Sequence, residues 1–231
     1  MSHESLLAGA LGGLLWLDRF QICQFMVSRP IVSGPLVGWM VGDITAGTAS
    51  GILFEFLWLR TPPVGGFIAP DVTLGAIATA AVSAGVAAAT GTSLTSVVFL
   101  SFLVLLPLCF VGKGIDKLLR LGLGNIARRA EAAQRRGEDG IVRLYIAAGL
   151  VLGFFCAFLV LVPTIEGFTF LLSRVVRELP SPVCRSLGYG FYLVPLLGAT
   201  EYLLGMEEPK FKLLFISGFV VAAAMGSMLV F

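Results

Sequence analysis

The sequence has few charged residues. Only 13% of its 231 residues are Asp, Glu, Lys or Arg, about half the share of an average soluble domain. Hydrophobic residues make up 57%, and the mean hydropathy is +0.95. No charge occurs between Asp71 and Lys113, which leaves room for two spans of about 20 residues each, joined by a turn at Thr90–Ser93. The composition excludes a soluble domain and predicts an all-α, polytopic integral membrane protein.

Histidine and closely spaced cysteine are equally scarce. His3 is the single histidine, and the four cysteines at positions 23, 109, 156 and 184 share no close spacing. Metal sites and disulfide frameworks need such residues at short intervals, and nucleophilic catalysis needs a base beside the nucleophile. We therefore expect no metal, no cofactor and no catalytic residue in this chain. Because the N-terminus also lacks a basic start, we expect no cleaved signal peptide.

Lysine and arginine are concentrated in residues 113–143, which contain eight of the sixteen. The positive-inside rule predicts that this segment is cytoplasmic. Within it, we expect residues 115–136 to form an amphipathic helix along the membrane surface. Four acidic residues interleave with the basic ones and no aromatic residue does, so we expect no nucleic-acid partner.

The basic segment divides a single domain (residues 1–231) into an N-terminal membrane part (5–112), the cytoplasmic loop (113–143) and a C-terminal membrane part (144–231). In the C-terminal part, we expect spans at residues 144–165, 186–205 and 211–231. We expect residues 168–179, which carry three charges, to form an interfacial amphipathic piece.

The N-terminal third is interrupted by Gly and Pro. Its apolar stretches of about 10–14 residues are shorter than a membrane span requires, and we expect helices broken near Pro30–Gly38 and Pro62–Gly66. Broken or re-entrant helices are tolerated at membrane depth only where they are buried in protein or line a cavity. Transporters place their substrate sites at such interruptions.

Five acidic residues stand singly within apolar stretches: Asp43, Glu55, Asp71, Glu166 and Glu201. A carboxylate near the centre of a membrane helix costs roughly 2.5–3.5 kcal/mol on insertion scales. Carboxylates kept at that cost usually serve a polar pathway or a buried partner.

An ordered series of motifs runs from Gln24 to Asp71. It contains Ser28-Arg29-Pro30, Gly34-Pro35-Leu36-Val37-Gly38, Gly42-Asp43, Gly47, Gly51, Glu55, Trp58-Leu59, Pro63-Val64-Gly65-Gly66 and Pro70-Asp71. This series resembles the IIC membrane subunit of the mannose/fructose/sorbose family of the phosphoenolpyruvate-dependent sugar phosphotransferase system. More loosely, the resemblance extends over the whole chain.

The resemblance implies a permease subunit in the bacterial inner membrane that carries a hexose-type sugar and pairs with a homologous IID membrane subunit in an oligomer. In such systems, IIA and IIB proteins relay phosphate through histidines to the incoming sugar. The membrane subunits provide the sugar path and do not carry those histidines. Since His3 lies in a tail without a carboxylate to orient it, we expect no phosphoryl relay through this chain.

Sugar hydroxyls are bound by carboxylates and amides, and an aromatic face packs against the ring. Glu55, Asp71, Gln24 and Trp58 supply these groups near the broken segments. Gly65 and Gly66 would allow close substrate approach, although a tight turn is the simpler use. Asp71 could instead cap the helix that follows it, and the tryptophans could be interface anchors.

Four further residues are assigned structural or gating roles. Asp43 follows Gly42 and is expected to cap a helix, and Arg29 is expected to pair with Asp18 or Asp43. Arg60 stands where the resemblance leads us to expect a small or uncharged residue, and Glu201 has no counterpart that we can match.

Two functions remain open from the sequence. The first is a sugar permease subunit, without catalytic residues of its own, in a phosphotransferase complex. The alternative is a non-transporting assembly or regulatory subunit derived from the same family. Arg60 and the absence of a polar C-terminal tail favour this alternative.

Overall fold

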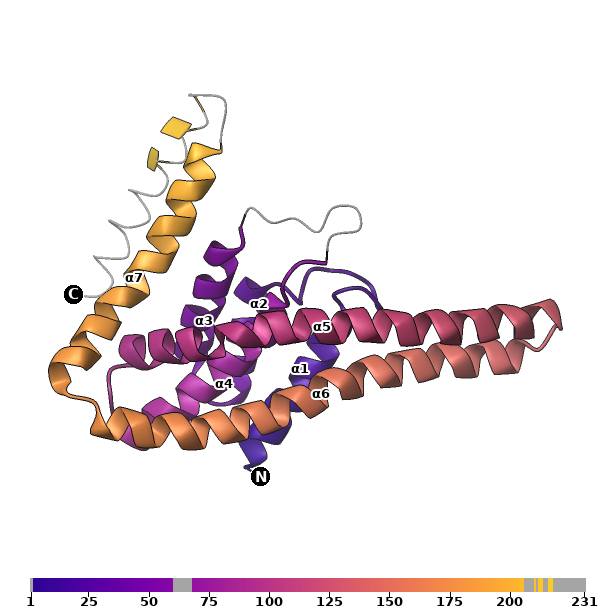
Figure 1. Cartoon of the computed structure of the whole chain (residues 1–231), viewed down its shortest axis with the longest axis horizontal. Coiled ribbons are helices and arrows are strands. Elements are labelled where there is room, and N and C mark those ends of the chain that lie inside the picture. Colours follow the sequence, from indigo (N-terminus) through magenta and orange to yellow (C-terminus); the bar gives the residue numbers. More distant parts are fainter. Residues whose placement is uncertain (1, 60–67, 206–209, 211, 214–215, 218–231) are drawn as a thin grey trace.

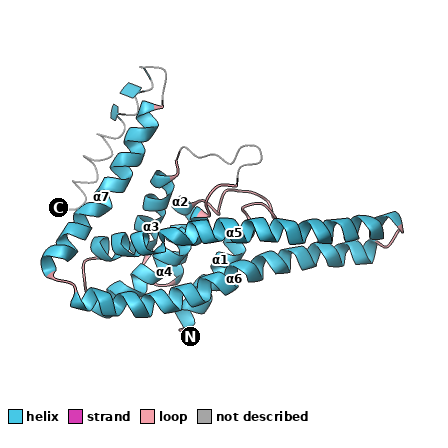
Figure 2. Ribbon diagram, viewed as in Figure 1, coloured by secondary structure: helices cyan, strands magenta, loops and turns pink. Residues whose placement is uncertain are grey.

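Within the residues that the structure describes, regular secondary structure is helical (Figures 1 and 2). The computed structural model describes residues 2–59, 68–205, 210, 212–213 and 216–217. Its helices are α1 (His3–Leu17), α2 (Pro30–Met40), α3 (Ile44–Leu57), α4 (Val72–Thr90), α5 (Leu94–Arg135), α6 (Asp139–Glu178) and α7 (Ser181–Leu204). Of these, α4, α5 and α6 are long and apolar enough to cross a membrane. The prediction of an all-α polytopic membrane protein is confirmed.

Helix α4 lies at the centre and packs against α1, α2, α3, α5 and α6. Small residues fill most of it, so neighbouring helices approach closely, and thirteen of its nineteen residues are buried. The helix ends at Gly91, whose φ of +66° is a left-handed conformation that glycine adopts without steric cost. Because α5 begins at Leu94, the predicted turn at 90–93 is confirmed.

Helices α5 and α6 form a long antiparallel hairpin that extends well beyond the other helices (Figure 1). The separate surface helix predicted for residues 115–136 is wrong, because α5 continues without a break through this segment to Arg135. The interfacial piece predicted at 168–179 is also wrong, since α6 runs to Glu178. In both places the charged residues suggested an end to the helix, although neither segment, 115–136 or 168–179, contains a proline.

The N-terminal third contains three short helices, of 15, 11 and 14 residues. The break predicted near Pro30–Gly38 is not confirmed inside that segment, because α2 is continuous from Pro30 to Met40. Pro30 occupies the first turn, where the missing N–H has no helical partner to lose. The chain leaves the helical conformation before and after α2, at residues 18–29 and 41–43. The second predicted break, near Pro62–Gly66, lies outside the described residues, and re-entrance itself remains a prediction.

Four glycines bring α2 and α3 into backbone contact. Gly34 and Gly38 lie on one face of α2, and Gly47 and Gly51 lie on the facing side of α3. A Cβ added to Gly34 would lie 3.0 Å from the Cα of Gly51, and one added to Gly47 would lie 2.8 Å from the Cα of Gly38. The spacing of four residues on each helix is the small-residue pattern that lets membrane helices pack closely.

We predict that Gly47→Ala lowers the free energy of unfolding by about 1–3 kcal/mol, because the added methyl group meets backbone atoms that cannot move independently. The matched control is Gly124→Ala on α5, where an added Cβ would meet no atom within 4 Å. There, improved helix propensity should leave stability equal or slightly higher. Unfolding of both purified variants in detergent measures the difference. Equal stability of the two variants would contradict the backbone contact.

Candidate functional site

A cavity of about 540 Å³ lies where the loop after α1, the start of α2, the end of α3 and helix α5 meet. Four residues assigned from the sequence line it together, namely Gln24, Arg29, Glu55 and Trp58. The remaining lining residues are Asp18, Arg19, Met26, Ser28, Pro30, Phe54, Ile68, Ala69, Pro70, Val72, Thr73, Asp116 and Arg120. The cavity is therefore built mainly from the N-terminal third of the chain.

Asp18 fixes the loop that forms one side of the cavity. Its Oδ1 accepts a hydrogen bond from the Phe25 backbone N–H at 2.7 Å, and its Oδ2 accepts one from the Ser28 N–H at 3.2 Å. Within this loop Cys23, Gln24 and Met26 have positive φ angles of 53°, 56° and 65°. Such conformations cost roughly 1–2 kcal/mol each for residues other than glycine. The carboxylate of Asp18 thus holds a strained loop that presents residues 24 and 26 to the cavity.

Glu55 and Arg29 form an ion pair at the cavity wall. Glu55 Oε2 also accepts a hydrogen bond from the Ile31 N–H at 3.4 Å, in the first turn of α2, where the helix dipole favours negative charge. The predicted pairing of Arg29 with Asp18 or Asp43 is wrong. Asp18 is occupied by the loop backbone, and Asp43 accepts from the Ala46 N–H at 2.9 Å, which makes it the N-cap of α3 as expected.

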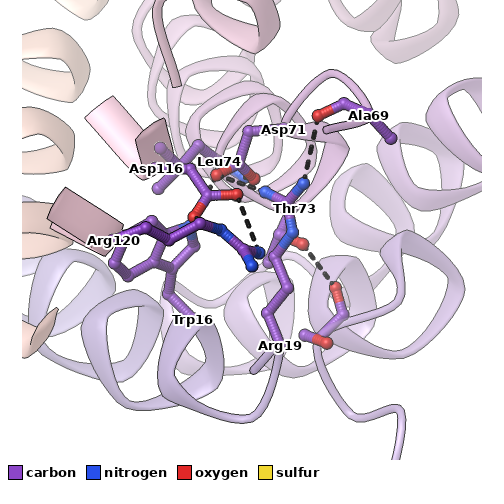
Figure 3. Close-up of polar contacts among 9 residues, drawn as sticks. Trp16, Arg19, Ala69, Asp71, Thr73, Leu74, Asp116 and Arg120 are labelled. Carbon is purple, nitrogen blue, oxygen red and sulfur yellow. Dashed lines mark hydrogen bonds and ion pairs between the residues drawn. The ribbon is translucent and has the colours of Figure 1, made fainter. Parts of the chain in front are cut away.

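Asp71 lies behind the cavity wall and is completely buried (Figure 3). Its Oδ2 accepts a hydrogen bond from Trp16 Nε1 at 2.6 Å and lies 2.5 Å from an Arg19 guanidinium nitrogen. Its Oδ1 accepts from the Leu74 N–H at 3.2 Å, which caps α4. Asp71 therefore caps α4, as the alternative in the sequence analysis expected. Its role as a sugar ligand remains a prediction.

A second ion pair, which sequence reasoning missed, lies beside Asp71 (Figure 3). Arg120 Nε donates to Asp116 Oδ1 at 2.8 Å, and a terminal nitrogen donates to Oδ2 at 3.3 Å. Asp116 is fully buried, and the Arg120 guanidinium lies over the Phe20 ring at 4.7 Å. The i,i+4 spacing of Asp116 and Arg120, just after the uncharged stretch, was the available signal. From the sequence alone, both residues are explained as part of the charged segment 113–143.

The charges around the cavity are balanced. Three arginines (19, 29 and 120) line it, and so do three carboxylates (18, 55 and 116). Each arginine has a carboxylate partner in the structure. One wall is aromatic, because Trp58 stacks on Phe54 with ring centroids 6.3 Å apart and an interplanar angle of 6°. Balanced charge, many hydrogen-bonding groups and an aromatic face suit an uncharged, polyhydroxylated ligand better than an ion.

The other assigned residues lie elsewhere. Gly65, Gly66 and Arg60 fall outside the described residues. Glu201 is exposed on α7 and does not line the cavity. Across the described part of the chain, His, Cys, Asp and Glu side chains do not gather in groups of three as a metal ion would require.

We predict that Trp16→Phe lowers the free energy of unfolding by about 1.5–3 kcal/mol, because the variant removes a donor to a buried carboxylate. Trp16 is fully buried, whereas Trp39 is 69% exposed, so Trp39→Phe is the matched control and should change stability by less than about 0.5 kcal/mol. Denaturant unfolding in detergent compares the two. An equally small effect at both positions would mean that Asp71 does not depend on Trp16.

Comparisons with known proteins agree on one family. Residues 3–231 match the sequence model of the family described as the PTS system sorbose-specific IIC component. Over 69 residues, the chain is 36% identical to an Escherichia coli (strain K12) protein provisionally named N-acetylgalactosamine permease IIC component 2. That match covers 30% of this chain and 51% of the relative, so it spans about half of the relative's length.

Two solved structures have a similar fold. One, described only as a membrane protein, superposes with a TM-score of 0.70 at 19% identity and covers 99% of this chain and 92% of its own. The other is a complex of the mannose transporter ManYZ with microcin E492. Its matching chain gives a TM-score of 0.60 at 18% identity and covers 98% of this chain and 92% of its own. At these identities the likeness establishes the fold.

Proposed function

The chain belongs to the family of PTS system sorbose-specific IIC components, and from this premise we propose that it carries a hexose-type sugar across the bacterial inner membrane. The observation that supports this best is the charge-balanced cavity, which has carboxylates, an amide and an aromatic wall. An uncharged sugar could enter such a cavity without leaving a buried charge unpaired.

Within the cavity, Glu55 is the principal sugar ligand. Its carboxylate can accept hydrogen bonds from two adjacent hydroxyls, and Gln24 can both donate and accept. The Trp58 ring offers an apolar face for the C–H side of the sugar. Arg29 is then a gating residue, because it competes with the sugar for Glu55 Oε1. Asp71 acts indirectly, by holding Arg19 at the edge of the cavity.

The partners are proposed to be a IID membrane subunit and the IIA and IIB phosphoryl carriers, with the IIC and IID subunits assembled in an oligomer. Many large apolar side chains on the outer faces of α6 and α7 are exposed in the isolated chain, including Phe155, Leu159, Phe170, Leu193 and Leu197. Lipid and a second membrane subunit would both cover such faces. The IIA and IIB proteins supply the phosphoryl group, and this chain supplies the sugar.

The alternative of a non-transporting assembly or regulatory subunit has less support. A protein that only assembles others needs no polar cavity. Such a protein would gain nothing from the strained 18–29 loop that places Gln24 in the lining of the same cavity as Glu55. The permease function uses both features.

The basic segment 113–143, which forms the outer part of the α5–α6 hairpin, is proposed to be cytoplasmic. In a chain with its four cysteines replaced by alanine, Arg128→Cys should react with an impermeant maleimide only after the membrane is opened, because its side chain would face the cytoplasm. Thr92→Cys, in the turn at the other end of α5, is the control and should react in intact cells once the outer membrane is permeabilised. Labelling of Arg128→Cys in intact cells, with Thr92→Cys protected, would show that the topology is the opposite of the one proposed.

We predict that Glu55→Gln lowers sugar uptake at least tenfold. The amide preserves volume but loses charge-assisted hydrogen bonds, each worth roughly 1.5–3 kcal/mol, and about 1.4 kcal/mol corresponds to a factor of ten in affinity. The measurement is uptake of labelled hexoses by cells that express this chain with a IID subunit and the phosphoryl carriers.

A charge swap separates ligand binding from structure. The double variant Arg29→Glu/Glu55→Arg can re-form the ion pair but moves the carboxylate to α2. If Glu55 binds sugar, the swap should restore stability without restoring uptake. Uptake at the unmodified level in either Glu55→Gln or the swap would assign Glu55 to a structural role.

A further inference from the structure

A second cavity, of about 490 Å³, lies at the end of the molecule opposite the hairpin tip. It is formed where the α4–α5 turn meets the end of α6 and the start of α7 (Figure 1). Its lining residues are Thr90, Thr92, Ser93, Val176, Arg177, Leu179, Ser181, Cys184 and Arg185. The two cavities share no residue, so this one is separate from the sugar site.

The charge of this cavity is one-sided. It is lined by two arginines and four hydroxyl side chains but by no carboxylate, in contrast to the balanced first cavity. Arg177 donates one hydrogen bond, to the Ala89 carbonyl at 3.2 Å, which leaves most of its five donors available. Within the described part of the chain, Arg185 makes no hydrogen bond or ion pair. Two cationic groups with spare donors therefore border one concave surface.

Hydrogen bonds hold the two sides of this cavity together. Ser96 donates its hydroxyl proton to the Cys184 carbonyl at 2.6 Å. Because Ser96 has a single proton to give, Ser93 must be the donor in its 2.6 Å contact with Ser96. This chain of bonds fixes the first turn of α5 against the first turn of α7. The N-cap of α5, Ser93, makes no side-chain cap hydrogen bond, which leaves backbone N–H groups in the first turn of α5 for an added acceptor.

We propose that this second cavity binds a phosphate group, held by Arg177 and Arg185, and that its source is the headgroup of an anionic lipid. Arginine is well suited to this ligand because its planar guanidinium binds phosphate through two parallel hydrogen bonds.

Position and surroundings favour lipid over free phosphate as the source. The α4–α5 turn connects two candidate membrane spans, so it lies at the depth where hydrocarbon gives way to headgroups. Val175 and Val183, next in sequence to lining residues, are 40% and 42% exposed. They offer exposed apolar surface for acyl chains on the same turns of α6 and α7 that carry the arginines.

The test compares Arg177→Gln and Arg185→Gln with a matched control, Arg174→Gln. Arg174 lies one turn before Arg177 on α6, and its guanidinium packs over the Phe170 ring at 4.1 Å instead of lining the cavity. The purified full chain is delipidated in mild detergent. It is then titrated with phosphatidylglycerol, phosphatidylcholine or inorganic phosphate, and binding is followed by native mass spectrometry and thermal unfolding.

We expect phosphatidylglycerol to bind and stabilise the unmodified chain and the Arg174→Gln control. Each cavity variant should lose roughly tenfold in affinity, the equivalent of one charge-assisted bond. Binding of inorganic phosphate alone, lost in the same variants, would support the phosphate site but assign it to a soluble anion.

Equal binding of phosphatidylglycerol and phosphatidylcholine, or unchanged phosphatidylglycerol affinity in the Arg177→Gln/Arg185→Gln double variant, would overturn the proposal. The unfolding temperature without lipid serves as the folding control. Arg185→Gln keeps the test valid if Arg177→Gln disturbs the α4 contact, since Arg185 has no such contact to lose. Because the measurement is lipid binding, its result is independent of sugar uptake.

Discussion

The buried carboxylate of Asp71 is the interaction on which the rest of the structure depends. It accepts hydrogen bonds from Trp16 and from the first turn of α4 and pairs with Arg19, while its backbone N–H donates to the Cys109 carbonyl of α5 at 2.8 Å. One residue therefore connects α1, α4 and α5 at a point where no water competes. A buried charge without these partners would be strongly destabilising, so the three helices must meet there in one arrangement.

That arrangement sets the electrostatics of the larger cavity, the proposed sugar site. Arg19 is held by Asp71 from behind, and Arg120 is held by Asp116 from the side, so neither guanidinium presents a free charge to the ligand. Two ion pairs line the cavity with both partners, and they differ in the exposure of the carboxylate: 12% of the Glu55 side chain is accessible but none of Asp116, whereas their arginines are similarly exposed. A ligand can compete for Glu55 at a lower cost than for Asp116.

Of the residues that the sequence assigned to a sugar site, Gln24, Glu55 and Trp58 line one cavity and Asp71 does not, and sugar binding itself stays a prediction. The sequence also predicted the helical class and the central turn, because hydropathy and a Gly-containing turn are local signals. It did not predict the α5–α6 hairpin or the pairing of Arg29 with Glu55. The charged residues at 115–136 and 168–179 suggest that a helix ends in each segment. Only the packing of α5 against α6 shows that both helices continue. Which carboxylate pairs with Arg29 depends on how α2 packs against α3. The glycine contact determines that packing, and no single residue in the sequence indicates it.

The glycine contact between α2 and α3 also has a consequence for biosynthesis. The two helices are separated by only residues 41–43, so bringing them together closes a very short loop at little entropic cost. Their glycine contact is formed by residues 30–51 and needs no later part of the chain. The pair can therefore assemble while translation is still in progress, once residue 57 has left the ribosome and before the helices that will enclose the cavity have been synthesised.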